Sequence, residues 1–414
     1  MLLLLLFYFL LSWLHFKFII NYDDFNYVAF SQDINFRLIW YRYLIVTLLF
    51  LLSNIFLLYI KVSNFLFSIL YLILFFFVMP SGLLFASSSA INPEIFISHN
   101  LFFISIYLGS LIKWNLNFPQ LNTYQSTLLL LSVTVIGLIP FIISYGPYIN
   151  IKNLWLSDVY ETRRLVAEKI NNVYTAYTYS WFSKIIIPIA LVFSIYFRKK
   201  AFLLFSIFSL LFLYLCGAHK TVFLGTLLII GFYKYDYLRK TFYFIKVITL
   251  FLVVALLCAL IFEFNILWEL SFRRVLMLSA LLDYCYFDFF HDNYIYWSNS
   301  FMSRFISYPY EISPDFLIGR DYFNRPLMNA NVGIISDGYK NAGYWGIGIN
   351  IAVVAIIISF FNSLRISPKF FGLFLLFLFS LLNSSLTTIL LTHGGFLMVL
   401  IAAFLLKDTE LKLI

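Results

Sequence analysis

The chain has 414 residues, of which 63% are hydrophobic and 11% are charged, and it carries a formal net charge of +9. An ordinary soluble domain holds about 25% charged residues, so no soluble core could bury this much apolar surface. The composition therefore predicts an integral membrane protein in which the bilayer solvates most of the chain. A basic excess is typical of nucleic-acid binding or of membrane topology, and the positions of the charges decide between them.

Twelve apolar runs are long enough, or nearly long enough, to cross a bilayer, which takes about 20 residues. The first begins at residue 1 without a basic start or a small-residue cleavage site, so we expect a retained span. In chain order the runs cover residues 1–20, 41–60, 65–79, 97–112, 126–145, 181–197, 201–217, 221–233, 242–262, 344–361, 370–386 and 388–406. We therefore predict an all-α polytopic membrane protein with about twelve transmembrane helices, in which residues 1–414 form a single integral membrane domain.

The basic residues concentrate in every second connection between these runs. With the N-terminus inside, the inside connections hold twelve basic and three acidic residues: Lys61, Lys113, Arg198, Lys199, Lys200, Lys234, Arg239, Lys240, Arg365, Lys369, Lys407 and Lys412, with Asp236, Asp408 and Glu410. Basic and acidic residues are equal in number elsewhere, so the whole excess lies on one side. Cytoplasmic loops show this positive-inside pattern. It places both termini in the cytoplasm and indicates no nucleic-acid partner.

Two outer connections, 146–180 and 263–343, are much longer than the roughly 12–15 residues beyond which loops are usually functional or disordered. The second is rich in aromatic residues, which argues against disorder, and between Asp283 and Asp292 it alternates them with charges. We expect it to carry short amphipathic helices at the outer membrane surface. Three scattered cysteines and the lack of any Cys/His cluster or P-loop predict neither a metal site nor a cofactor.

Basic residues in the outer connections are the first candidates for chemistry. Arg163 lies in the first long loop, Arg273 and Arg274 begin the second, and Lys220 lies in the short connection 217–221. A guanidinium binds phosphate oxygens bidentately and keeps its charge. Arginines above an apolar bundle therefore suit a lipid phosphate or pyrophosphate. The alternative for each of them is a solvated loop charge.

The stretch 329–346 is the densest polar motif, with three asparagines, four glycines and Asp337 before the tenth apolar run. The amides of Asn329, Asn331 and Asn341 and the carboxylate of Asp337 suit sugar hydroxyls. The alternative is an ordinary turn that leads into a helix, since such turns also use Gly and Asn.

The histidines are weaker candidates. His291, in the second long loop, is a reserve candidate for a catalytic base. His15 and His99 are expected at the membrane interface. His393 lies at or between the last two runs, where it marks either a functional site or a small-residue packing site.

Four of these segments, in this order, resemble the O-antigen polymerase family, the Wzy-type polymerases of oligosaccharide repeat units, which is related to the O-antigen ligases. Asp158-Val-Tyr-Glu-Thr-Arg163 resembles the family's Asp-Val-Tyr-x-x-Arg element, and residues 217–221 are similar to its Gly-x-x-Lys-Ser/Thr element. Arg273-Arg274, with the aromatic stretch 286–300, resembles the start of its second large loop. Residues 329–343 match the Asn-Ala-Asn-x-Gly and Asp-Gly-Tyr-x-Asn-x-Gly pattern that ends it. The N-terminal third matches only in hydropathy.

The resemblance implies a metal-independent glycosyltransferase of the GT-C-like class that acts at the periplasmic face of the bacterial inner membrane. Its substrates would be undecaprenyl-pyrophosphate-linked glycans, and a chain-length regulator protein would be a further partner. Arg163 would bind the pyrophosphate, with Arg273, Arg274 and Lys220 as weaker candidates. Asp337, with His291 in reserve, would activate or orient the acceptor hydroxyl.

Other functions are open for the same architecture. An O-antigen ligase that transfers polymer to the lipid A core would share it, although the His-containing motif of ligases is not evident. A lipid-linked oligosaccharide flippase or another transporter is the other alternative. A transporter is expected to show discontinuous helices and polar residues at the membrane midplane, whereas the predicted spans are almost purely apolar.

Overall fold

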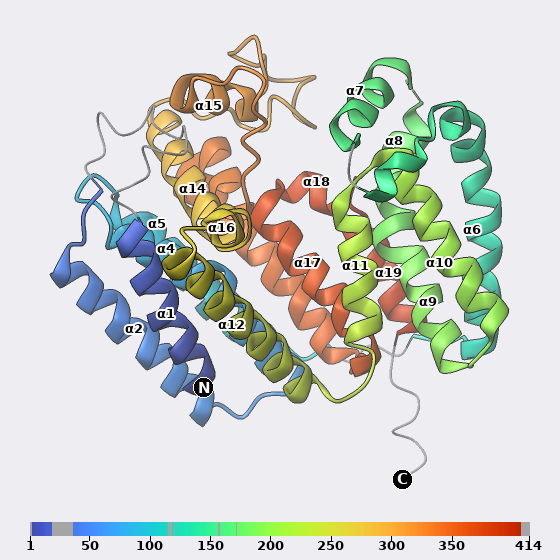
Figure 1. Cartoon of the computed structure of the whole chain (residues 1–414), viewed down its shortest axis with the longest axis horizontal. Coiled ribbons are helices and arrows are strands. Elements are labelled where there is room, and N and C mark those ends of the chain that lie inside the picture. Colours follow the sequence, from blue (N-terminus) through green and yellow to red (C-terminus); the bar gives the residue numbers. More distant parts are fainter. Residues whose placement is uncertain are drawn as a thin grey trace. The chain divides into compact units, whose positions relative to one another are not determined.

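The computed structural model describes residues 2–18, 36–114, 118–119, 121–155, 158–170 and 172–406. All the regular elements of this part of the chain are helices (Figure 1). Seven are long and apolar enough to cross a membrane: Trp40–Tyr59, Asn64–Phe85, Tyr124–Tyr148, Val173–Tyr196, Lys200–Gly217, Tyr237–Ile261 and Ile334–Ser363. Leu2–Lys17, Pro368–Asn383 and Gly395–Leu405 are shorter apolar helices. The prediction of an all-helical membrane protein is confirmed, whereas twelve spans and the assignment of loops to one side stay predictions.

The described residues group into two compact units. Unit 1 comprises Met1–Lys113, Thr241–Ser359 and Phe379–Leu386, and unit 2 comprises Trp114–Lys240, Phe360–Leu378 and Thr387–Ile414. Both units are therefore assembled from segments that lie far apart in the sequence. The single domain predicted over residues 1–414 stays a prediction.

Unit 1 is built around a helix that is apolar on every side. Its elements are α1 (Leu2–Phe18), α2 (Trp40–Tyr59), α3 (Asn64–Ile73), η3 (Leu74–Val78), α4 (Met79–Phe85), α5 (Pro93–Gly109), most of α12 (Tyr237–Ile261), α13 (Ile266–Trp268), η7 (Glu269–Met277), α14 (Leu278–Phe289), α15 (Pro314–Phe323) and most of α16 (Ile334–Ser363). In the continuous segment α3–η3–α4, 94% of the apolar window is buried, against 33% in α12. An all-apolar helix is stable either inside a bundle or against lipid. The buried segment α3–η3–α4 is an example of the first case, and the largely exposed α12 is an example of the second.

The sequence predicts a polar stretch followed by a span at 344–361, but the helix α16 begins at Ile334 and is broken in the middle. Ala342 (φ −154°, ψ 31°) and Gly343 (φ 58°, ψ −139°) are not helical. Residues on opposite sides of the break lie close together. A Cβ on Gly346 would lie 2.0 Å from Gly338 O, and the Asn350 side chain donates to Ile334 O at 2.8 Å. Residues 334–341 and 344–363 are thus two antiparallel arms, the α16 hairpin. The alternative of an ordinary turn before residue 344 is wrong.

The break in α16 leaves backbone carbonyls without a helical partner, and the preceding loop satisfies them. Ile295 N donates to Lys340 O at 2.9 Å, and Tyr296 N donates to Asn341 O at 3.0 Å. The Asn341 side chain accepts a hydrogen bond from Trp297 N at 2.8 Å. Since an unpaired carbonyl in an apolar bundle is costly, these bonds stabilise the hairpin at the point where it turns.

Unit 2 is a second helical bundle. It contains α6 (Thr123–Tyr145), η4 (Gly146–Tyr148), η5 (Ile151–Trp155), α7 (Val159–Lys169), α8 (Val173–Trp181), η6 (Phe182–Ile186), α9 (Ile187–Tyr196), α10 (Lys200–Gly217), α11 (Lys220–Gly231), η8 (Pro368–Phe370), most of α17 (Phe371–Asn383), most of α18 (Leu386–Leu390) and α19 (Gly395–Leu405). α8, η6 and α9 form one continuous helix with a π-helical turn. The helix of the predicted sixth span therefore begins at Val173, inside the predicted loop 146–180.

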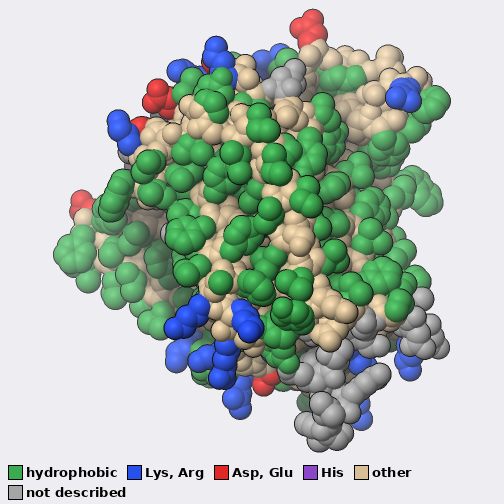
Figure 2. All heavy atoms as spheres, turned by 90° about the vertical axis from the view of Figure 1, so that its right-hand side faces the viewer, with side chains coloured by type: hydrophobic (Ala, Val, Ile, Leu, Met, Phe, Trp, Pro, Cys, Tyr) green, Lys and Arg blue, Asp and Glu red, His purple; other side chains and the backbone are tan. Residues whose placement is uncertain are grey.

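The surface agrees with a lipid environment. α6 exposes a series of large apolar side chains, which are Leu128, Leu129, Val133, Val135, Ile136, Ile139, Ile142 and Ile143. Figure 2 shows a face of the molecule whose middle is covered by hydrophobic side chains, with Lys and Arg gathered near its lower end. Such a wide apolar band between charged ends is typical of a bilayer-spanning protein.

Not all membrane helices are as apolar as predicted. Lys184 lies in the π-helical turn of the span Val173–Tyr196, and Asp337 and Lys340 lie in α16. The expectation of almost purely apolar spans therefore does not hold for the helix that carries Lys184, whereas Asp337 and Lys340 lie before the predicted span 344–361. His15 and His99 are buried within the protein, with 0% and 3% of their surface exposed, and their expected place at the membrane interface stays a prediction.

The hairpin makes a prediction about its glycines. Gly346→Ala places a methyl group 2.0 Å from Gly338 O, so the arms must separate. We expect a loss of about 1–3 kcal/mol, as for overpacked cores, seen as a lower melting temperature of the purified protein in detergent.

Gly348→Ala is the matched control in the same arm. A Cβ there has no atom within 4 Å, so we expect an unchanged melting temperature or a small rise from helix propensity. Equal effects of the two substitutions would contradict the hairpin.

Candidate functional site

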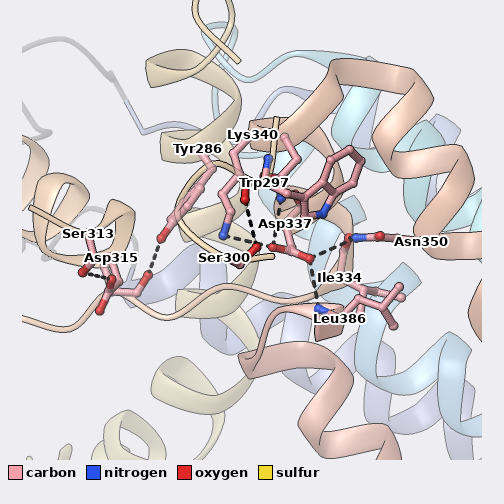
Figure 3. A network of polar contacts seen from close by, with 12 residues as sticks. Tyr286, Trp297, Ser300, Ser313, Asp315, Ile334, Asp337, Lys340, Asn350 and Leu386 are labelled. Carbon is pink, nitrogen blue, oxygen red and sulfur yellow. Dashed lines mark hydrogen bonds and ion pairs between the residues drawn. The ribbon is translucent and has the colours of Figure 1, made fainter. Parts of the chain in front are cut away.

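The centre of unit 1 is the carboxylate of Asp337, in the first arm of the α16 hairpin (Figure 3). One oxygen lies 3.0 Å from Lys340 Nζ and accepts from the Asn341 side chain at 3.4 Å. The other oxygen accepts from the Asn350 side chain at 3.2 Å and from the backbone N–H of Leu386 at 3.0 Å. Asp337 thereby joins both hairpin arms to the N-terminus of α18.

These contacts limit what Asp337 can do. The side chains of Asp337 and Lys340 are only 3% and 8% exposed, so their charges are buried as a neutral pair. The two oxygens of a carboxylate offer about four lone-pair positions, and four donors occupy them here. This geometry suits a carboxylate that positions its neighbours, and the role of base or acceptor-orienting group stays a prediction.

Of the other residues predicted for this site in unit 1, only Asn341 contacts Asp337. Asn329 and Asn331 are exposed on the segment before the hairpin, and Arg274 is exposed on η7. His291 is exposed and pairs with its neighbour Asp292 at 3.1 Å.

Arg273 is buried on η7, where its charge interacts with Glu269. Burial raises the pKa of the Glu269 carboxyl, and Arg273 opposes that shift. Because the acidic side chain of Glu269 lies beside it, Arg273 is a weaker candidate for binding an anion than an arginine that is surrounded by basic groups.

Arg163 lies in unit 2 on α7, and its guanidinium donates to Ala218 O at 2.8 Å. Ala218 is the left-handed residue that ends α10 (φ 48°). Arginine near a helix C-terminus commonly satisfies such carbonyls. Arg163 is thus held against the connection 217–221 singled out in the sequence. Lys220 begins α11, but its side chain lies outside the described residues.

Four basic side chains of unit 2 form a group, the basic cluster: Arg163, Lys184, His219 and His393. The pKa of His219 is lowered to about 4 by burial and then by the charges of Arg163 and Lys184. The pKa of His393 is lowered to about 3 by burial and then by Lys184 and His219. Within the described part of the chain, no carboxylate contributes to either shift. At neutral pH both histidines are therefore uncharged, and Arg163 and Lys184 are the members of the cluster that favour an anion.

Local structure explains why these side chains meet. Trp181, directly before the π-helical turn that carries Lys184, donates from Nε1 to Leu391 O at 2.7 Å, which holds the α18–α19 connection against α8. The ring of Tyr179 lies 5.3 Å from that of His219, and its hydroxyl donates to Leu213 O at 2.8 Å. A π-helical turn inside a helix is frequent at functional sites.

No protein-family model, curated protein or solved structure matches the chain. The site therefore has to be judged on its own chemistry.

Sequence reasoning named Arg163, Asp337 and Asn341, whose roles stay predictions, but did not name Lys184, Lys340 or Asn350. Lys184 was visible as a charge inside an apolar run, which is by default a functional signal. Lys340 stands three residues after Asp337, a spacing that pairs side chains on a helix. No group of three or more potential metal ligands occurs among the described residues.

The buried pair makes a prediction. Asp337→Asn leaves the ammonium of Lys340 without its counter-charge, so we expect a loss of about 3–5 kcal/mol. The measurement is the unfolding free energy of the purified protein in detergent.

Asp337→Asn with Lys340→Met removes both charges. We expect this double variant to be more stable than Asp337→Asn alone. Additive losses would show that the two side chains do not interact.

The basic cluster predicts acid sensitivity. An unfolded histidine has a pKa near 6.5, above the folded values of about 4 for His219 and about 3 for His393. At pH values between the folded and unfolded pKa, the unfolded chain binds more protons than the folded protein. The free energy of unfolding is therefore highest above pH 6.5 and decreases as the pH falls through 4 and 3.

Melting temperatures measured from pH 7 to pH 4 should fall less in His393→Gln than in the wild type. Exposed His291→Gln should behave as the wild type does. An identical acid response of His393→Gln and the wild type would argue against a buried neutral His393.

Proposed function

We propose that the protein is a glycosyltransferase of the bacterial inner membrane that polymerises undecaprenyl-pyrophosphate-linked oligosaccharide repeat units at the periplasmic face. The growing chain would move from its lipid carrier to the end of an incoming lipid-linked repeat. The basic cluster of unit 2 is the observation that carries this proposal. The resemblance of segments around Arg163, Lys220, Arg273 and Asp337 to O-antigen polymerases supports it.

The chemistry of the cluster fits a lipid-linked pyrophosphate. The substrate must combine an anionic group with a long apolar chain, and unit 2 offers basic side chains within a bundle whose outer helices are apolar. Charge develops on the pyrophosphate as it leaves the sugar, and cations fixed in advance stabilise that charge. Arg163, held by Ala218 O at 2.8 Å, needs little reorganisation to act in this way.

The α16 hairpin fits a role in positioning the acceptor. Its motif, from Asn329 to Gly343, resembles the pattern that ends the second large loop of the polymerases. Asp337 and Lys340 fix the fold of the hairpin. The exposed Asn329 and Asn331 and the aromatic residues of the preceding loop are available to contact sugar hydroxyls and ring faces.

A lipid-linked oligosaccharide flippase is the second candidate, and two observations favour it. Helices are interrupted at the π-helical turns η3, η6 and η7 and at the break in α16. Lys184 lies in the middle of the span Val173–Tyr196, and Asp337 and Lys340 lie in the first arm of α16. Discontinuous helices and charges at depth are typical of transporters. An O-antigen ligase shares the proposed substrate but has no observation in its favour.

Substitution of Arg163 tests the polymerase. Arg163→Gln keeps an N–H donor for Ala218 O but removes the charge, so the protein should still fold while the pyrophosphate loses a cation. In cells whose own gene is replaced by this variant, we expect a gel of surface polysaccharide to show core with one repeat and a ladder reduced at least tenfold. The amount of protein in the membrane should be unchanged.

Arg164→Gln is the matched control, because Arg164 is exposed on the same helix and pairs with Glu168 at 3.9 Å. It should give a normal ladder. A normal ladder in Arg163→Gln would reject the role of the cluster, and a normal ladder in deletion cells would reject the polymerase. Deletion cells in which no repeat reaches the core would identify a flippase or a ligase instead, and a flippase would leave single lipid-linked repeats at the cytoplasmic face.

A further inference from the structure

Three segments of unit 2, where one helix ends and the next begins, carry a further concentration of positive charge. They are residues 196–200, 231–240 and 364–370. Asp236 is their one acidic residue. Their eight basic residues, the turn group, are Arg198, Lys199, Lys200, Lys234, Arg239, Lys240, Arg365 and Lys369.

Direct contacts hold the three segments together. The ammonium group of Lys240 donates to Pro368 O, which joins the start of α12 to η8. The ammonium group of Lys369 lies 4.0 Å from the centre of the Tyr196 ring, which joins η8 to the end of α9. Residues 364–370 therefore connect the other two segments, and the turn group lies at one end of unit 2.

Most of the charge of the turn group is exposed and lacks a counter-charge. Asp236 accepts from the Arg239 backbone N–H at 2.8 Å, and its other oxygen lies 3.8 Å from the Arg239 guanidinium, so this acid already has a partner. Five members are exposed and form no ion pair with a carboxylate of the described residues: Arg198, Lys199, Lys200, Lys234 and Arg365. Like charges gathered at one end of a bundle favour an anion.

The surface next to the turn group is apolar. Lys200 begins α10, and Leu204 and Phe208 follow at intervals of four residues, so the three side chains share one face of the helix. Leu204 and Phe208 are 53% and 63% exposed. A ligand that fits this face combines an anionic group at the end of the helix with an apolar chain along it.

The turn group is distinct from the basic cluster of the same unit. α10 begins at Lys200 in the turn group and ends at Gly217, directly before Ala218, whose carbonyl binds Arg163 of the basic cluster. A helix of 18 residues spans about 27 Å, close to the roughly 30 Å of a bilayer's hydrocarbon core. The two groups thus lie at opposite ends of one span and would face headgroups of opposite leaflets.

We propose that the turn group binds an anionic phospholipid, with the lipid phosphate among the exposed basic side chains and an acyl chain along Leu204 and Phe208. Basic pockets between spans on the cytoplasmic side bind anionic headgroups, and all three segments lie in connections predicted to be cytoplasmic. The apolar face of α10 favours a lipid over a soluble anion. This binding site is separate from the proposed polymerisation and does not rest on it.

Native mass spectrometry of the purified full-length protein tests the site. The protein is mixed in detergent with equal amounts of phosphatidylglycerol and phosphatidylcholine, which have the same acyl chains and differ in headgroup charge. We expect the wild type to retain more phosphatidylglycerol. Lys200→Gln with Lys234→Gln should lower this preference by about fivefold or more, because each basic residue near an anionic lipid surface strengthens binding about fivefold.

Lys61→Gln with Lys113→Gln is the matched control. It removes two exposed charges from other connections that are predicted to lie on the same side, outside the turn group. It should keep the wild-type preference for phosphatidylglycerol. An equal loss in the two double variants, or no preference in the wild type, would overturn the proposal.

Thermal unfolding separates a lipid from a soluble phosphate compound. A ligand that binds only the folded protein raises its melting temperature, so phosphatidylglycerol should raise that of the wild type more than that of Lys200→Gln with Lys234→Gln. Glycerol 3-phosphate at the same concentration should have no effect. An equal rise with both compounds would reject the lipid and identify a site for soluble phosphate groups. Neither measurement depends on whether the protein is a polymerase.

Discussion

The hydrogen-bond requirement of a backbone in lipid explains most of this structure. Water cannot satisfy a carbonyl or amide inside an apolar bundle, so every helix that stops or breaks there needs a partner from the protein. Three long basic side chains serve this purpose. Arg42 donates to Ser88 O and Ile91 O after α4, Arg163 donates to Ala218 O after α10, and Lys240 donates to Pro368 O at η8.

The same requirement explains the α16 hairpin. A helix that breaks at Ala342 and Gly343 exposes two carbonyls, and the loop at residues 295–297 has to be folded against it to satisfy them. Asp337 then fixes both arms to the start of α18. The glycines of the motif are therefore explained by geometry before any function is considered: Gly343 adopts a positive φ, and Gly338 and Gly346 let the arms touch.

The sequence was sufficient for features that depend on local composition. Long apolar runs predicted helices such as α2, α6 and α12 close to their observed bounds, because hydropathy over about 20 residues is a local property. The start of the Val173–Tyr196 helix was missed, because Tyr and Thr between residues 173 and 180 do not resemble a membrane span. The hairpin was missed for another reason. Its evidence is the meeting of Gly338 with Gly346, a tertiary contact that hydropathy does not encode.

The candidate residues also divide into those that local sequence patterns indicate and those that only tertiary contacts reveal. Arg163 and Asp337 were named as candidates because they belong to polar motifs, and Lys184 was not named because it stands alone in an apolar run. The contacts of His99 with Asp283 join residues 184 positions apart, and no spacing rule predicts such a pair. Lys340 was open to prediction from its position relative to Asp337.

The buried charges of the two units differ in one respect that bears on function. In unit 1, Asp337 lies 3.0 Å from Lys340 Nζ and Asp283 lies 3.3 Å from His99 Nε2, so both carboxyl groups have a partner inside the protein. Replacing such neutral pairs by apolar residues is often neutral or stabilising, so stability alone does not explain why the hairpin keeps them, whereas the need to fix one conformation does. In unit 2, burial and neighbouring cations depress the pKa of both His219 and His393. Both histidines are therefore uncharged at neutral pH, and Arg163 and Lys184 supply the positive charge of the cluster. The buried carboxyl groups of unit 1 thus have partners within the protein, whereas the basic cluster of unit 2 is where the proposed anionic substrate would bind.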